Sequence, residues 1–210
     1  MSRKSESRKS VTLKPKIDRR VRRTRDALGD ALIALIQEKR FETITVQNVL
    51  DRAGIGRSTF YAHYRGKDDL LLSDMEDFLE GMSTLLLRRR EASSRVAPVY
   101  ELFDHVAEMR HLVAALTAAG KMRDFLEMAQ EYFARAIEQR FRAMAMTRGI
   151  PPAQRKATSQ ALAGALLSLM SWWLDHDTPA SPQDMDALFH QIVWSGAGAK
   201  TATALHRRGA

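Results

Sequence analysis

The clearest structural pattern in this chain is Thr45-Val-Gln-Asn-Val-Leu-Asp-Arg-Ala-Gly-Ile-Gly-Arg-Ser-Thr-Phe-Tyr-Ala-His-Tyr64. Its first apolar residues recur at the spacing of one helical face: Val46, Val49, Leu50 and Ala53. Thr45 precedes that face as a natural N-cap. Gly54 stands where helices often end in the left-handed conformation, and Gly56 keeps the turn short before a second helix, expected over 57–64. This pattern predicts a helix-turn-helix.

The second helix is polar except for two anchors. Phe60 and Tyr64 lie four residues apart, so we expect both to pack on the first helix. The other side chains are suited to hydrogen bonding: Arg57, Ser58, Thr59, Tyr61 and His63. Such side chains contact phosphates and base edges when a short helix enters a DNA groove. We expect Arg57 to bind guanine and Thr59 to contact a thymine methyl or a phosphate. The alternative is a solvated surface helix.

The segment from Ala53 to Tyr64, followed by Lys67 and Asp68-Asp-Leu-Leu71, resembles the signature of the TetR family of transcriptional regulators. The resemblance is strong over residues 19–75 and extends further only by pattern. It implies that Thr45 caps its helix against a phosphate and that Arg57, Ser58 and Thr59 open the helix that reads bases. It also implies that Tyr61 and His63 hold the DNA backbone, and that Lys67 reaches a phosphate. One departure is Gly56, where many members have a capping Ser, which puts one phosphate contact in doubt.

Charge is concentrated at the N-terminal end. The formal net charge is +8, and residues 1–67 carry 17 Lys and Arg against 7 Asp and Glu. This end is therefore expected to bind a polyanion, here double-stranded DNA. Residues 1–18 are basic and poor in apolar side chains, so we expect a disordered arm. The arm either follows phosphates or a minor groove, or is a solubilising tail.

A reading head is expected over residues 19–66. Its first helix should run from Arg19 to Lys39, with a run of arginines in its first turns. Positive charge at a helix N-terminus opposes the helix dipole, which a nearby phosphate backbone would explain. The expected core of the head has eight members: Leu28, Leu32, Leu35, Phe41, Val49, Leu50, Phe60 and Tyr64.

The rest of the chain is helical by pattern, and the expected fold class is all-α. Helices are expected at 67–90, at 98–118 with a kink around Arg110, and at 121–147, 152–175 and 182–195, because Gly and Pro residues separate them and no stretch alternates as a strand does. Residues 67–195 would then form an effector-binding and dimerisation body, and residues 196–210 a flexible tail.

The last two expected helices are very apolar. Helix 152–175 mixes small residues with Leu and Trp, and helix 182–195 places Met185, Leu188, Phe189, Ile192 and Val193 at helical spacing. Pairing with a second copy in a four-helix bundle would bury both, so we expect a homodimer; the alternative is that both helices are core. The TetR resemblance implies the same interface.

Aromatic residues and methionines are frequent in the middle helices, where they either line an apolar cavity or form ordinary core. The TetR resemblance implies an effector pocket here. Our candidates for its lining are Phe103, Met109, Tyr132 and Met170. The effector itself is an unknown small molecule.

Several classes of function are not expected. The chain has no cysteine, no apolar signal segment near its start, and no membrane span, since the uncharged run 158–174 is short and contains polar residues. His105-x-x-Glu108-x-x-His111 lacks the second Glu-x-x-His motif of a di-iron bundle, and its histidines point in different directions. No catalytic triad or phosphate-binding loop is present. We expect a cytoplasmic protein with no metal, cofactor or enzymatic activity.

The sequence thus favours a sequence-specific DNA-binding regulator, a repressor released from its operator by a small molecule. Two alternatives remain. One is an α-helical protein that binds or converts a small molecule and binds DNA nonspecifically, and the other is an architectural DNA-binding protein without an effector.

Overall fold

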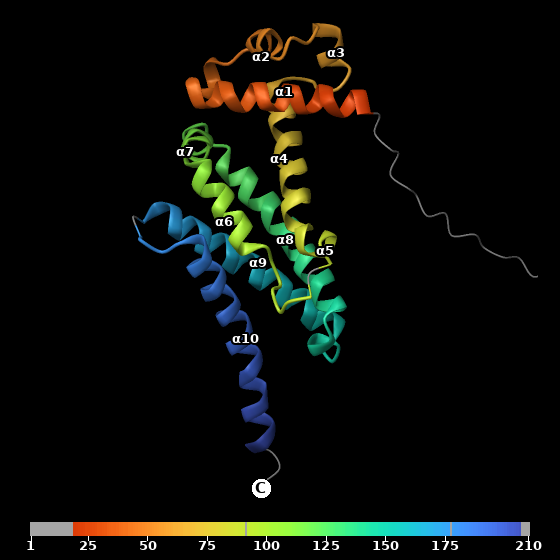
Figure 1. The fold of residues 1–210 in the computed structure, drawn as a ribbon, viewed down its shortest axis with the longest axis vertical. Coiled ribbons are helices and arrows are strands. Elements are labelled where there is room, and N and C mark those ends of the chain that lie inside the picture. Colours follow the sequence, from red (N-terminus) through yellow and green to blue (C-terminus); the bar gives the residue numbers. More distant parts are fainter. Residues whose placement is uncertain (1–18, 91, 177, 207–210) are drawn as a thin grey trace, which may run out of the picture.

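The computed structural model describes residues 19–90, 92–176 and 178–206, and side chains up to residue 195 except Met146. The basic arm expected over 1–18 lies outside these residues. Every regular element in the described part is helical, in ten α-helices and two short 3-10 helices, which confirms the all-α prediction. Figure 1 shows a head of three helices lying across one end of a longer helical body.

The head consists of α1 (Arg19–Glu38), a 3-10 turn (Phe41–Thr43), α2 (Val46–Ala53) and α3 (Arg57–Tyr61). Helices α2 and α3 lie on the side of α1 that faces away from the body (Figure 1). All eight residues predicted for the core of the head are buried: Leu28, Leu32, Leu35, Phe41, Val49, Leu50, Phe60 and Tyr64. Their burial confirms that this apolar pattern builds one small core.

The ends of α2 follow the expected local chemistry. The Thr45 hydroxyl accepts a hydrogen bond from the Asn48 N–H at 3.2 Å, and the Asn48 side chain accepts one from the Thr45 N–H at 3.1 Å. This reciprocal capping box satisfies two N–H groups that a helix start leaves free. Gly54 ends the helix with φ 64°, in the left-handed region that glycine adopts without strain.

One long helix was expected over 67–90, but the structure divides it. Helix α4 (Lys67–Ser83) ends at Thr84, and a single turn, α5 (Leu85–Arg88), follows. The Thr84 hydroxyl donates a hydrogen bond to the Glu80 carbonyl at 2.6 Å. Such back-bonding competes with the helical ladder and bends helices, which accounts for the break.

The body contains α6 (Val99–Glu108), α7 (Arg110–Ala118), α8 (Met122–Ala143), a 3-10 turn (Ala145–Thr147), α9 (Pro152–Asp175) and α10 (Pro182–His206). Helix α8 packs along α9, and α10 packs against α6. The kink expected around Arg110 is a break at Met109 between α6 and α7. Helix α10 continues to His206, past the expected end at 195, through a segment containing several alanines, which favour helix. The remaining expected tail, 207–210, lies outside the described residues.

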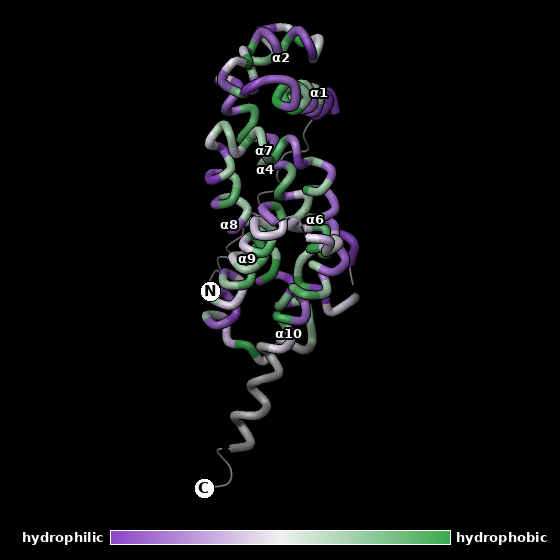
Figure 2. Tube along the Cα trace, turned by 90° about the vertical axis from the view of Figure 1, so that its left-hand side faces the viewer, coloured by the Kyte–Doolittle hydropathy of each residue, from purple (hydrophilic) through white to green (hydrophobic). Residues whose placement is uncertain are grey.

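The core of the head does not stop at residue 66. It includes Leu70, Leu71 and Met75 of α4, together with Leu116 of α7. Figure 2 shows hydrophobic residues recurring on the helices on both sides of the junction between head and body. The boundary expected at 66/67 therefore crosses a continuous apolar cluster, because α4 and α7 cover the side of α1 that faces the body.

No helix in the described ranges is both long enough and apolar enough to cross a membrane.

Candidate DNA-binding surface and ligand cavity

Helix α3 presents polar side chains on a short, well-anchored turn. Phe60 is fully buried and holds the helix on the head, whereas Arg57, Ser58 and Thr59 are exposed. The helix ends at Tyr61 rather than at the expected residue 64. Its N-cap is Gly56, which has no side chain to cap the helix, as the sequence implied.

The residues after α3 divide between surface and core. Tyr61 is 52% exposed, and His63 is also exposed. Tyr64 is buried, and its hydroxyl accepts a hydrogen bond from Arg25 Nε at 3.1 Å. The Arg25 guanidinium also donates to Ser73 Oγ at 2.7 Å and to Asp77 at 2.9 Å. Arg25 therefore fastens the end of the helix-turn-helix to α4.

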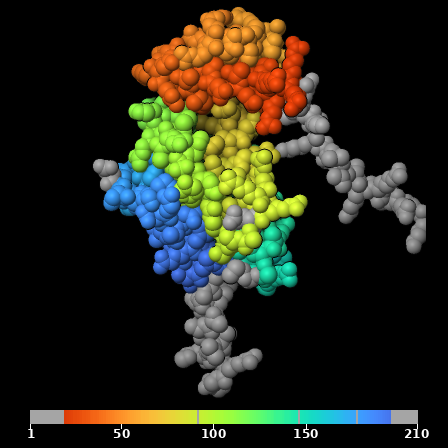
Figure 3. Space-filling view, in the orientation of Figure 1, coloured from red at the N-terminus to blue at the C-terminus, as the bar shows by residue number. Residues whose placement is uncertain are grey.

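Two further features describe the exposed surface around α3. A long hydrogen bond of 3.5 Å joins Arg57 Nη2 to Gln47 Oε1 of α2, so the Arg57 side chain leans towards the neighbouring helix while its guanidinium stays exposed. A shallow hollow brings predicted residues of α3 next to the first turns of α1, with this lining: Arg20, Val21, Thr24, Ser58, Thr59, Ala62 and His63. The basic start of α1 thus adjoins the exposed side chains of α3, as a surface for a phosphate backbone requires. In Figure 3 the head forms the whole upper end of the molecule.

Lys67 differs from the expectation. Its Nζ donates hydrogen bonds to the carbonyl oxygens of Phe41 at 2.6 Å, Ile44 at 2.7 Å and Glu42 at 3.3 Å. It also lies 4.5 Å from the centroid of the Phe41 ring. An ammonium group has three N–H donors, and here all three have acceptors within the head. Lys67 therefore joins α4 to the 3-10 turn instead of extending towards a phosphate.

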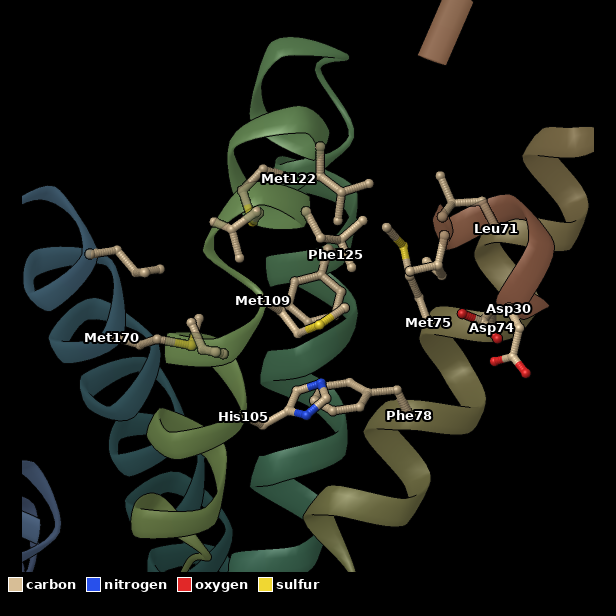
Figure 4. Close-up of a pocket in the computed structure, with 16 residues that line it drawn as sticks. Asp30, Leu71, Asp74, Met75, Phe78, His105, Met109, Met122, Phe125 and Met170 are labelled. Carbon is tan, nitrogen blue, oxygen red and sulfur yellow. The ribbon is translucent and has the colours of Figure 1, made fainter. Parts of the chain in front are cut away.

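A cavity of about 270 Å³ lies where the head meets the body (Figure 4). Its wall comes from α1, α4, α6, α7, α8 and α9, and it is lined by Asp30, Ile33, Leu71, Asp74, Met75, Phe78, His105, Val106, Met109, Leu112, Val113, Leu116, Met122, Phe125, Met170 and Leu174. Thirteen of these sixteen side chains are apolar, and several are methionines. A wall of this kind adapts to an apolar ligand.

Two of the four candidate lining residues belong to this cavity, namely Met109 and Met170. Phe103 does not, because it is fully buried in the core of the body with its ring centroid 5.2 Å from that of Trp173. Tyr132 lies elsewhere as well, in a hollow beside the lower end of α4, under the Arg135 guanidinium at 4.6 Å. Both have the apolar character of a pocket residue, but their helices turn them towards other neighbours.

Sequence reasoning missed the polar residues of the cavity: Asp30, Asp74 and His105. Asp74 gave a signal, because it lies four residues after Leu70 and four before Phe78, on the apolar side of its helix. Burial raises the pKa of the Asp74 carboxyl to about 6, and the nearby charges of Asp30, Asp77 and Asp26 add to this shift.

His105 stacks on Phe78, with ring centroids 4.8 Å apart and an angle of 27°. Burial lowers the pKa of the His105 imidazole, which favours its neutral form. In the described part of the chain, no group of three or more His, Cys, Asp or Glu is arranged to hold a metal ion.

Comparison with protein families identifies both halves of this architecture. Residues 28–73 match the family model of bacterial regulatory proteins of the tetR family, and residues 98–194 match the model of a TetR-type transcriptional regulator C-terminal region. The chain belongs to the TetR family. It is a DNA-binding transcriptional regulator, with its helix-turn-helix in the head.

Individual relatives agree with this assignment. The uncharacterized HTH-type transcriptional regulator YxbF of Bacillus subtilis (strain 168) is 45% identical over 56 residues, a match that covers 26% of this chain and 15% of that relative. A TetR transcriptional regulator from Streptococcus agalactiae 2603V has 25% identity and a TM-score of 0.56, covering 84% of this chain and 96% of its own.

The fatty acid degradation regulator FadR from Bacillus halodurans is 17% identical, with a TM-score of 0.54, covering 80% of this chain and 93% of its own. At that identity the likeness concerns the TetR fold alone.

Proposed function

We propose that this TetR-family regulator is a homodimeric, sequence-specific repressor that leaves its operator when a small molecule occupies the cavity. One observation carries the proposal. The cavity wall includes Asp30 and Ile33 of α1, a helix of the reading head, as well as five helices outside it. A ligand there would contact both parts at once, so its binding energy would depend on how the head sits on the body.

The proposed recognition rests on α3. Arg57, Ser58 and Thr59 are exposed and belong to α3, which lies on the side of the head away from the body (Figure 1), and the buried Phe60 anchors this helix. We assign base contacts to Arg57 and Thr59, and backbone contacts to Ser58, Tyr61 and His63. Thr45 stands at the start of α2, where its exposed hydroxyl already caps the helix.

The proposed dimer rests on an exposed apolar face of α9 and α10. Trp172 is 45% exposed, Leu188 38% and Ile192 52%, although all three are large hydrophobic residues. Upstream of Trp172, small side chains of α9 are also exposed at helical spacing: Ala157, Ala161, Ala165 and Ser168. Small residues allow two helices to approach closely, so a second copy seated on this face would cover it.

Release then follows from geometry. A dimer must hold its two recognition helices about one DNA turn, roughly 34–36 Å, apart or a multiple of that distance. Because α1 forms part of the cavity wall, a ligand that prefers a different angle between α1 and α4 would disturb this spacing without touching DNA. Thermodynamic linkage requires operator DNA to weaken ligand binding by the same factor by which the ligand weakens DNA binding, typically about 5–150-fold.

The test of recognition begins with selection of a binding site from a random duplex library, followed by fluorescence anisotropy on that site and on unrelated DNA. We expect a palindromic site. Arg57→Ala should cost about 1–3 kcal/mol on the selected site and little on unrelated DNA, whereas Tyr61→Phe should weaken both alike. Equal losses on both DNAs for Arg57→Ala, or no palindrome, would favour an architectural protein instead.

The test of the dimer is sedimentation of the double variant Leu188→Glu, Ile192→Glu. Because two carboxylates on the proposed seam would lose their hydration on association, we expect monomers. Exposed Gln191 lies between them, so Gln191→Glu adds a charge to the same helix as a milder control. A folded dimer of the double variant would place the interface elsewhere.

A further inference from the structure

The polar residues of the cavity point to the class of ligand. Asp30 and Asp74 both line it, and among the residues that the structure describes no Lys or Arg does. Figure 4 shows the two carboxyl groups at the end of the cavity formed by α1 and α4, with Met170 at the opposite side. A ligand that fills the apolar part therefore meets acidic groups of the protein at one end and hydrophobic side chains of the protein along the rest.

The Asp74 carboxylate lacks a partner within the described part of the chain, where it takes part in no hydrogen bond or ion pair. The charge of Arg25 acts on this carboxylate, but the Arg25 guanidinium donates its hydrogen bonds to Tyr64, Ser73 and Asp77. A carboxylate that is partly removed from water without a counter-charge is costly, and a positive group on a ligand would relieve that cost.

The aromatic rings that line the cavity also favour a positively charged ligand. Phe78 and Phe125 line the cavity, with ring centroids 6.4 Å apart, and aromatic faces attract cations. His105, stacked on Phe78, adds no fixed positive charge because burial favours its neutral form. A ligand carboxylate would instead meet Asp30 and Asp74 with the same sign of charge.

We propose that the cavity binds a hydrophobic cation, an organic amine or quaternary ammonium whose charge lies against Asp74 and Asp30 and whose apolar part lies among the methionine and phenylalanine side chains. A volume of about 270 Å³ is slightly below the usual range for ligand pockets, roughly 300–1,000 Å³, and suits one aromatic ring and a short alkyl chain. Only the regulatory consequence of this site rests on the proposed function, because binding itself needs no DNA.

The position of the two acids gives the cation a route to the head. Asp30 belongs to α1 and Asp74 to α4, and the helices approach closely between them. A Cβ added to Gly29 would lie 2.4 Å from Asp74 Oδ1. A cation between the carboxylates replaces their repulsion by two attractions, and so favours a different packing of α1 on α4 than the empty cavity does.

The experiment is isothermal titration calorimetry of the full chain at pH 7.5 with three probes of one shape: 4-phenylbutylammonium, the neutral 4-phenylbutan-1-ol, and the anion 5-phenylpentanoate. We expect the ammonium to bind at least about tenfold more tightly than the alcohol, as for a hydrogen-bonded ion pair, and the anion to bind most weakly. Equal or tighter binding of the alcohol or the anion, or an ammonium Kd weaker than about 1 mM, would overturn the proposal.

Variants locate the charge. Asp74→Asn should remove the preference for ammonium over alcohol, and Asp30→Asn should reduce it; either variant alone suffices if the other does not fold. Glu76→Gln is the matched control, because Glu76 is an exposed acid of the same helix outside the cavity wall. If the preference persists in Asp74→Asn and Asp30→Asn, or disappears in Glu76→Gln, the proposed position of the cation is wrong.

A separate titration with operator DNA distinguishes this inference from the proposed function. If the ammonium binds as expected but leaves operator affinity unchanged, the cation site is supported and ligand-induced release is refuted. If no operator can be selected, the repressor proposal fails while the calorimetric result still decides the ligand class.

Discussion

Replacing Asp74 by Asn should stabilise the ligand-free protein, because it removes a charge that the fold holds in a mostly apolar cavity wall. The structure raises the pKa of this carboxyl from 3.8 to about 6, chiefly through burial and then through Asp30, Asp77 and Asp26, while Arg25 acts in the opposite direction. A folded pKa above the unfolded value means that folding favours the protonated form. The stabilising contribution of Asp74 is therefore complete below pH 3.8 and is lost as the pH rises through about 6.

The magnitude follows from the two pKa values. Their separation corresponds to about 3 kcal/mol at pH 7.5 and to about half of that at pH 5. Asn keeps the shape of the side chain but brings a partly buried amide of its own, so we expect a net gain of about 1–3 kcal/mol at pH 7.5. For a chain of this length each kcal/mol raises Tm by about 2–4 °C.

The assay is urea unfolding followed by circular dichroism at pH 5 and pH 7.5, at one protein concentration because association also stabilises the folded state. The gain of Asp74→Asn over the wild type should be larger at pH 7.5. Glu76→Gln should stay within about 0.5 kcal/mol of the wild type at both values. If Asp74→Asn is no more stable than the wild type at pH 7.5, or if its gain does not grow with pH, Asp74 is not a desolvated carboxylate.

Three further substitutions test how the head is built. Thr45→Ala removes one half of the capping box with Asn48 and should cost about 1 kcal/mol of unfolding free energy, measured by urea unfolding; no loss would mean that water caps the helix equally well. Lys67→Met removes the donor to three carbonyl oxygens and should cost about 1–3 kcal/mol, whereas unchanged stability with weaker DNA binding would support the phosphate contact that the TetR resemblance implies. Gly29→Ala should lower Tm because its Cβ meets the Asp74 carboxylate, and Asp74→Ala in the same chain should recover much of the loss; additive losses would exclude the contact.

Local chemistry explains which features could be predicted from the sequence. Thr45 and Gly54 act within one turn of their own helix, so the residue type alone predicts the N-cap and the left-handed C-terminal end. The burial of Phe60 and Tyr64 follows from helical spacing in the same way. These features need no knowledge of distant parts of the chain.

The cavity depends on distant parts of the chain, and there the sequence was a weaker guide. Asp30 and Asp74 are separated by more than forty residues and meet only because α1 crosses α4 at Gly29. Phe103 lies in α6 and Met109 follows directly after its end, yet Phe103 faces the core and Met109 lines the cavity. A single sequence does not fix the rotation of each helix about its axis, so composition alone could not separate lining from core.

The shared apolar cluster at the top of the body limits how this regulator can be recombined. Because Leu116 of α7 and the first turns of α4 complete the packing of α1, a recognition head excised at residue 66 would expose a hydrophobic surface. A chimera that joins this head to another sensor domain must therefore include α4 and α7, or carry polar substitutions on the exposed side of α1. In this molecule the part that can be exchanged as a unit is defined by its packing, and it is larger than the DNA-binding motif.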